Sequence, residues 1–119
     1  MSEPCLERER LAEIASLDAF RPGFRDRLIG LFQAAVEQHL PLCVGDVETS
    51  AAQRQQAAHS LKGAAAGIGA VQLAALAHQL EQIAKTSAPT WPNPSALTLA
   101  AAEATAALRA WSAANSGVS

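Results

Sequence analysis

Apolar residues recur at helical spacing along most of this chain, and this periodicity decides the fold class. One stripe, with spacings of three, four and three, consists of Leu73, Leu76, Leu80 and Ile83. Another, with spacings of four, three, four and three, consists of Leu97, Ala101, Ala104, Leu108 and Trp111. Such spacings place residues on one face of a helix. No alternating pattern bounded by turn residues indicates a strand, so the sequence predicts an all-α protein.

Four long helices are predicted, at about residues 22–43, 50–68, 70–87 and 94–113. The connections between successive helices are short, which favours antiparallel neighbours. A weaker amphipathic segment from about Cys5 to Leu17 is expected to cap one end. With 119 residues, the chain is long enough for one hydrophobic core. We therefore expect a single domain over residues 1–119, an antiparallel up-down-up-down four-helix bundle with a short N-terminal capping helix.

The first long helix has one broad apolar face, made of Phe24, Leu28, Leu31, Phe32, Ala35 and Val36. Pro22 suits its first turn, where a backbone N–H is not needed. Pro41 has no N–H and would clash with the preceding turn, so the helix is expected to kink or stop near Leu40. His39 falls inside the apolar face, and we expect it to be half-buried. In the next helix, Thr49 or Ser50 is expected to be the N-cap.

Charge and composition exclude several function classes. The net charge of −2 gives no basic footprint for nucleic acid. No apolar stretch approaches the ~20 residues that span a bilayer, and the charged N-terminus lacks a secretory signal. We therefore expect a cytoplasmic protein that binds no membrane. Cys5 and Cys43 lack metal or redox spacing and are expected to be free thiols. His78 and Glu81 lack the supporting carboxylates of a metal-binding bundle, so no metal site is expected.

His59 is the candidate reactive residue. On a helix it lies opposite the apolar positions Ala57, Leu61, Ala64, Ala65 and Ile68. The residues around it are polar or small: Ala52, Gln55, Gln56, Lys62, Gly63 and Ala66. Gly63, one turn on, leaves the imidazole uncrowded, and Lys62 brings a cation beside it. An exposed nucleophilic imidazole next to a positive charge suits a phosphoryl group better than a metal, which needs several ligands.

The run His59-x-Leu61-Lys62-Gly63, followed by Gly69, resembles the signature of histidine phosphotransfer (Hpt) domains of multistep two-component relays. The resemblance extends to Leu80-Glu81. It implies a bundle with a phosphorylated histidine halfway along an exposed helix. It further implies a phosphoryl carrier, not an enzyme, whose partners are the receiver domain of a response regulator, a hybrid sensor histidine kinase, or both. We expect a monomer.

The chain has no Gly-rich phosphate loop and no acidic set for Mg²⁺, so it is expected to bind no cofactor. The resemblance implies that the receiver supplies Mg²⁺ and that its aspartyl phosphate exchanges the group with His59. Lys62 would compensate phosphoryl charge, while Gln55, Gln56, Gly63 and Ala66 would contact the partner. In the family the ε2 nitrogen carries the phosphate, which implies a δ1 nitrogen that is free or weakly bonded.

Two questions stay open at the level of sequence. A carboxylate at Glu81 could orient the imidazole of His59, although it would repel phosphate. Equally, Glu81 could lie on a solvated helix flank, paired with Lys85 four residues on. The second question is the class of function. The alternative to a phosphoryl carrier is a helical module that binds a kinase or receiver domain without being phosphorylated.

Overall fold

The chain forms five α-helices in the computed structural model, which describes residues 6–44, 50–85 and 94–114. They are α1 (Arg8–Phe20), α2 (Phe24–Val44), α3 (Ala51–Ile68), α4 (Val71–Lys85) and α5 (Pro94–Ala114). All regular secondary structure in these ranges is helical, which confirms the all-α prediction.

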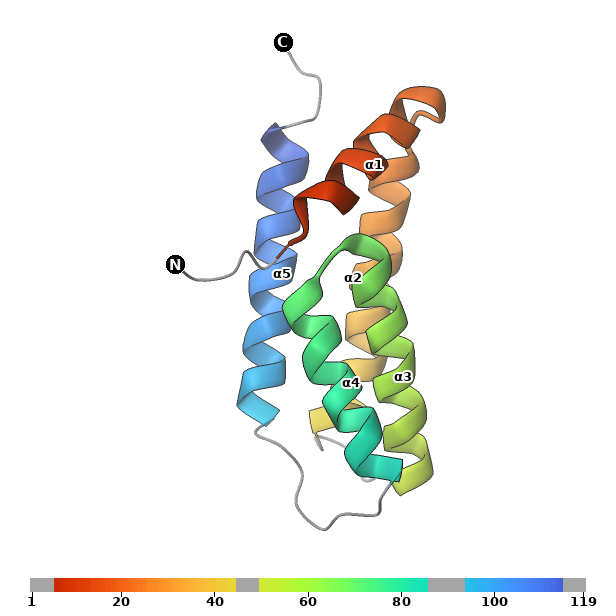
Figure 1. Cartoon of the computed structure of the whole chain (residues 1–119), viewed down its shortest axis with the longest axis vertical. Helices are drawn as coiled ribbons and strands as arrows, with labels where there is room; N and C mark the ends of the chain where they lie inside the picture. The colour runs from red at the N-terminus through yellow and green to blue at the C-terminus, as the bar shows by residue number, and fades with distance from the viewer. Residues whose placement is uncertain (1–5, 45–49, 86–93, 115–119) are drawn as a thin grey trace.

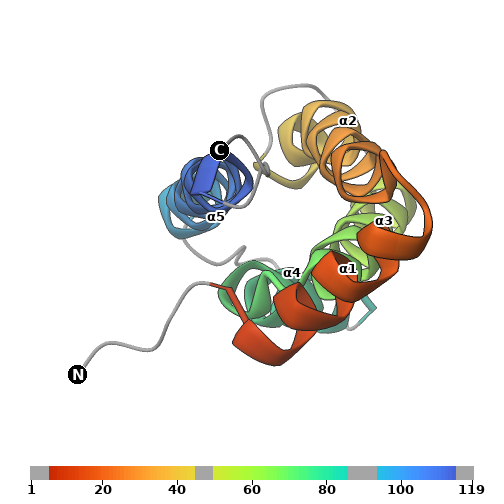
Figure 2. The ribbon, with the colours of Figure 1, turned by 90° about the horizontal axis from the view of Figure 1, so that it is seen from above.

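The helices α2 to α5 run side by side along the long axis, and α1 crosses one end of them (Figure 1). Helix α2 contacts α3 and α5, and α4 contacts the same two neighbours. The view from above shows these four helices in a ring, with α1 over one side (Figure 2). The arrangement confirms the up-down-up-down bundle and its N-terminal capping helix.

The corner between α1 and α2 differs from the prediction. Helix α1 starts at Arg8 and continues to Phe20 instead of ending at Leu17. Pro22 precedes α2 and is not part of its first turn. The turn is held by Asp18, whose Oδ1 accepts a hydrogen bond from the Arg25 backbone N–H at 2.9 Å. Asp18 lies inside α1, and the break follows it, later in the chain than expected. Cys5 lies outside the described residues.

At its C-terminal end α2 agrees with the predicted range of 22–43 and not with a stop near Leu40. It continues through Pro41 to Val44 and does not stop at Leu40. Pro41 is only three residues from the last residue of the helix, so its missing N–H affects the final turn alone. Cys43, in that turn, is fully buried in the core and fixes the helix there. Burial raises the pKa of its thiol to about 11. Cys43 is a thiol and not part of a disulfide, as expected.

The apolar face of α2 lies further round the helix than predicted. Leu31 is 57% exposed, whereas Ile29, which the sequence pattern left out, is buried. Helix α2 packs on both α3 and α5, and Ile29 faces the seam with α5 while Leu31 lies at the outer edge near α3. Phe32 is buried, and His39 is half-buried as expected.

Both ends of α3 are closed by local hydrogen bonds. Ser50 is the N-cap: its hydroxyl accepts from the Gln53 N–H at 3.1 Å, and the Gln53 side chain accepts from the Ser50 N–H at 2.9 Å. Thr49, the other candidate, lies outside the described residues. Gly69 caps the C-terminus with a φ of 80°. The short turn to α4 leaves α3 and α4 packed side by side.

The stripes on α4 and α5 face the core as predicted. Leu73 and Leu80 are buried on α4, with Leu76 and Ile83 half-buried. Four of the five residues on α5 are buried, and Trp111 is half-buried. Helix α4 begins at Val71 and is described to Lys85, so residues 86 and 87 of the predicted range fall outside the description. None of the helices that the structure describes is long and apolar enough to cross a membrane.

Candidate functional site

His59 projects from the outer face of α3. Its side chain is 62% exposed, while Ala58 and Leu61, on the inner side of the same helix, are fully buried. Seven alanines and two glycines in the helix give it few bulky side chains on either face. The predicted orientation of the imidazole toward solvent is therefore confirmed.

The imidazole of His59 is held from one side by Glu81 of α4. The distance from His59 Nδ1 to Glu81 Oε2 is 2.6 Å. An ionised carboxylate only accepts hydrogen bonds, so Nδ1 must carry the proton and donate it. In the neutral imidazole the tautomer is thereby set, and the lone pair is on Nε2. The sequence-based expectation of a free or weakly bonded δ1 nitrogen is wrong.

Glu81 also binds Lys62. Lys62 Nζ donates to Glu81 Oε1 at 2.5 Å, so the two oxygens of one carboxylate serve two residues of α3. Lys62 and His59 are three residues apart, on neighbouring positions of the same helical face. The cation therefore lies beside the ring as predicted, but it is anchored to Glu81. With its side chain 29% exposed, it is half-buried.

The Glu81 carboxylate is buried and charged. Its side chain is only 5% exposed, and the pKa of the carboxyl is lowered from 4.5 to about 2. The hydrogen bond from Lys62 is the largest cause, burial opposes it, and the hydrogen bond from His59 adds to the lowering. Glu81 is consequently ionised at neutral pH. Of the two interpretations left open by the sequence, the solvated flank paired with Lys85 is wrong.

A second histidine faces the same carboxylate. His78 Nδ1 lies 3.9 Å from Glu81 Oε1, beyond hydrogen-bond range, and its side chain is 54% exposed. Three basic side chains thus surround one buried acid. No group of three His, Cys, Asp or Glu suited to a metal ion occurs in the part of the chain that the structure describes.

Open surface lies on the other side of His59. Gly63 is exposed, and a Cβ placed on it would meet nothing within 4 Å. Gly63 and Gly67 line a groove of about 190 Å³ between α2 and α3, opposite Leu28 and Leu31. The exposed Leu31 therefore lies among other apolar residues in this α2–α3 groove. A partner could therefore approach the imidazole across Gly63 without meeting a side chain there.

A comparison with protein-family models matches residues 26–111 to the Hpt domain. The chain belongs to the Hpt domain family. Searches of curated proteins and of solved structures found no match. Hpt domains carry a phosphoryl group on histidine in phosphorelays, act as carriers and not as catalysts, and interact with receiver domains and kinases.

In this Hpt domain, three of the predicted site residues come together: His59, Lys62 and Glu81 are joined by hydrogen bonds. The four residues predicted to contact a partner do not join that network. Gln56, Gly63 and Ala66 are exposed, and Gln55 is half-buried. Their role in partner binding stays a prediction.

Sequence reasoning missed two features of the site. One is the α2–α3 groove, because the sequence pattern places Leu31 in the core. The other is the burial of Glu81, for which a signal existed. Glu81 follows Leu80 directly and lies four residues after Ala77, and both of these residues are buried. Its position within the apolar stripe of α4 therefore indicated an inward-facing acid.

Proposed function

We propose that this Hpt domain carries a phosphoryl group on Nε2 of His59 and exchanges it with the aspartate of a response-regulator receiver domain. The observation that supports this most is the contact between His59 Nδ1 and the ionised Glu81. It leaves a lone pair on Nε2, the ring nitrogen not engaged by Glu81, in a side chain that is 62% exposed.

The transfer balances without a proton acceptor. The Nε2 lone pair forms a bond to phosphorus, and the bond between phosphorus and the aspartyl oxygen breaks, releasing the receiver's carboxylate. The Nδ1 proton stays on the ring, which becomes cationic. Glu81, already charged and hydrogen-bonded to Nδ1–H, stabilises that positive charge. In the reverse direction the ring leaves with both electrons of the N–P bond and returns to the neutral tautomer.

Glu81 positions the imidazole of His59, and Lys62 compensates the negative charge of the phosphoryl group. The transferred group is loose and metaphosphate-like, so catalysis consists mainly of alignment and charge compensation. An ammonium group has three donors. Lys62 can therefore keep its bond to Glu81 while it donates to a phosphoryl oxygen. The negative charge of Glu81, which would otherwise repel phosphate, is offset by the same cation.

The partner contributes the remaining chemistry. The receiver domain supplies the Mg²⁺ ion and the aspartate, and it approaches His59 across the open surface at Gly63. The α2–α3 groove continues this surface, and the exposed Leu31 offers the apolar contact that interfaces commonly use at their centre. Gln56 and Ala66 flank the path on the exposed face of α3.

Phosphotransfer from a panel of phosphorylated receiver domains tests the assignment. We expect labelled phosphate on the wild-type protein that is labile in acid and stable in base, as a phosphoramidate is. The His59→Gln variant should carry none, whereas His39→Gln should behave like the wild type. Label that survives in His59→Gln would overturn the proposal. Binding of a receiver without any transfer would instead favour the non-phosphorylated interaction module.

A further inference from the structure

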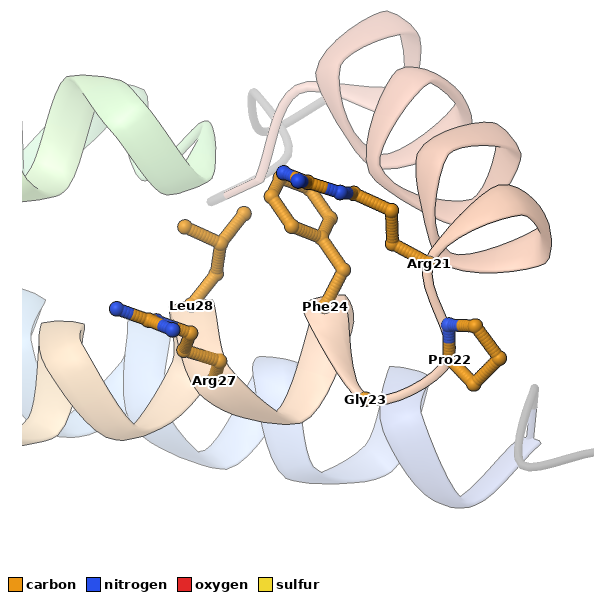
Figure 3. Close-up of a pocket in the computed structure, with 6 residues that line it drawn as sticks. All are labelled: Arg21, Pro22, Gly23, Phe24, Arg27 and Leu28. Carbon is orange, nitrogen blue, oxygen red and sulfur yellow. The ribbon is translucent and has the colours of Figure 1, made fainter.

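A second surface feature lies at the corner between α1 and α2. It is a cleft of about 520 Å³, lined by Arg21, Pro22, Gly23, Phe24, Arg27 and Leu28. In Figure 3 the side chains of Arg21, Phe24, Arg27 and Leu28 extend toward one side of the corner, and the Pro22 ring points away. The corner cleft thus combines two guanidinium groups with an apolar wall.

The charges of Arg21 and Arg27 are not neutralised locally. Neither side chain has an ion-pair or hydrogen-bond partner among the residues that the structure describes. The nearest acids in the chain are engaged elsewhere. Asp18 accepts the backbone N–H of Arg25, and Asp26 lines the opposite seam, between α2 and α5. The corner cleft is therefore a cationic spot on a chain whose net charge is −2.

The corner cleft is continuous with the surface beside His59. Leu28 lines both the cleft and the α2–α3 groove, and Gly63 and Gly67 line the groove on the other side. From His59 to Gly67 is about 12 Å along α3, and from Leu28 to Phe24 about 6 Å along α2. A standard interface covers about 800 Å² on each partner, a patch roughly 30 Å across. One docked domain would therefore cover both His59 and the corner cleft.

We propose that Arg21 and Arg27 bind acidic side chains of the protein that docks over His59 and thereby help to select that partner. This inference rests on the proposed function. A guanidinium fork matches the two oxygens of a carboxylate, and unpaired forks at the edge of an interface favour an acidic counterpart. Charges at such a rim act mainly on the association rate and its salt dependence. The shared Leu28 favours a protein carboxylate here over a free anion.

Charge-reversal variants test the inference. The probe is the phosphorylated receiver domain that transfers fastest to the wild type, and the readout is the second-order rate constant of transfer. Arg21→Glu and Arg27→Glu are compared with Arg109→Glu, which makes the same charge change on the exposed surface of α5. At low salt, we expect the rate constant of each corner variant to be about three- to tenfold below that of the wild type. The difference should become smaller at high salt, which screens the charges. Arg109→Glu should stay within about twofold of the wild type.

A small donor separates docking from chemistry. Phosphoramidate phosphorylates exposed histidine without a docked partner, so all three variants should react with it as fast as the wild type. Corner variants that match Arg109→Glu in transfer from the receiver would overturn this inference and leave the proposed function intact. A wild-type protein that accepts phosphate neither from a receiver nor from phosphoramidate would overturn both.

Discussion

The ammonium group of Lys62 interacts with two negatively charged groups. It compensates the buried charge of Glu81 at 2.5 Å, and in our proposal it also meets the phosphoryl group. Because the hydrogen bond from Lys62 is the largest cause of the lowered pKa of Glu81, loss of the cation would raise that pKa. Changes at Lys62 should therefore affect stability as well as transfer, although the side chain is partly exposed.

Lys62→Met, which keeps most of the aliphatic stem, should slow phosphotransfer from a receiver domain. A charge-assisted contact is worth on the order of 1.5–3 kcal/mol, or roughly ten- to hundredfold in rate if it forms in the transition state. The variant should also melt at a lower temperature, since Glu81 keeps its burial but loses a partner. A quenched time course of phosphotransfer checks the rate, and thermal unfolding of the same sample checks the stability.

The double variant Lys62→Met with Glu81→Gln separates these effects. Without the buried charge, the loss of Lys62 should cost less stability than it does in the single variant, because neighbouring substitutions are not additive. Transfer should nevertheless stay slow. Recovery of the wild-type rate in the double variant would mean that Lys62 acts only through Glu81.

How far the sequence predicts this site differs from residue to residue. The outward direction of His59 follows from its own helix, because the helical period alone separates it from Leu61 and Ala65. The pairing of Glu81 with His59 and Lys62 depends on how α3 and α4 pack against each other. Helical periodicity does not fix the rotation of one helix against another, so the bond to Nδ1 could not be predicted.

Two glycines, one inside α3 and one at its C-cap, serve opposite purposes. Gly63 lies inside the helix, with open space where a Cβ would be. Gly69 ends the helix with a φ of 80°, and a Cβ there would lie 3.1 Å from Cβ of Arg10 in α1. The first glycine keeps the surface beside His59 free. The second allows both the chain reversal and the close approach of α1.

Alanine substitutions at these glycines should have opposite effects on stability. Gly63→Ala should stabilise the protein by up to about 1 kcal/mol, since alanine has less backbone freedom to lose. Gly69→Ala should destabilise it by at least about 1–2 kcal/mol, because the left-handed conformation is unfavourable for a residue with a Cβ. Denaturant unfolding of both variants measures the difference. Equal stabilities would contradict the assigned backbone roles.

Gly63→Gln extends this comparison to function. The longer side chain should leave the fold stable, but it would fill the space beside His59. A displacement of about 1 Å at a reacting centre can cost about a hundredfold in rate. We expect the rate of transfer from a receiver to be highest in the wild type, lower in Gly63→Ala and lowest in Gly63→Gln. The rate of phosphorylation by phosphoramidate should change much less. A receiver that transfers equally well to all three would show that it does not approach across Gly63.

The helices themselves were largely predictable, and their ends were less so. The stripes on α4 and α5 are regular over three or more turns, so local periodicity was sufficient there. The end of α1 depends on Asp18 reaching Arg25, a contact across a turn. The continuation of α2 past Pro41 depends on the burial of Cys43 by neighbouring helices. At the end of α2, burial against neighbouring helices overrides the local signal of Pro41.

Helix α1 fixes the end of the bundle nearest the corner cleft. The Glu7 N–H donates to the Gly69 carbonyl at 2.7 Å, and Arg10 Nε donates to the Gly67 carbonyl at 2.8 Å. These bonds tie the start of α1 to the turn between α3 and α4. Its other end forms the corner with α2. The capping helix thus links the glycine-rich end of α3 to the cleft that holds Arg21.

The bond network of Glu81 makes the stability of the whole bundle sensitive to acid. Its pKa is about 2 in the folded protein, below the ordinary value of 4.5. A carboxylate whose pKa is lower in the folded state than in the unfolded state stabilises the fold. This stabilisation is fully present above pH 4.5 and is lost as the pH falls toward 2. Wild type should therefore melt at a higher temperature than Glu81→Gln at pH 7. The gap should stay constant down to about pH 5 and then close between pH 4.5 and pH 2.

Thermal unfolding of both proteins from pH 7 to pH 2, followed by circular dichroism, measures this gap. Glu103→Gln is the matched control, because Glu103 is exposed on α5 and has no ion-pair partner among the described residues. It should melt close to the wild type throughout this range. A gap for Glu81→Gln that persisted undiminished at pH 2 would mean that Glu81 stabilises the bundle by packing and not by its charge. In that case the hydrogen bond to His59 would not need an ionised acceptor, and the tautomer inferred for the imidazole would lose its support.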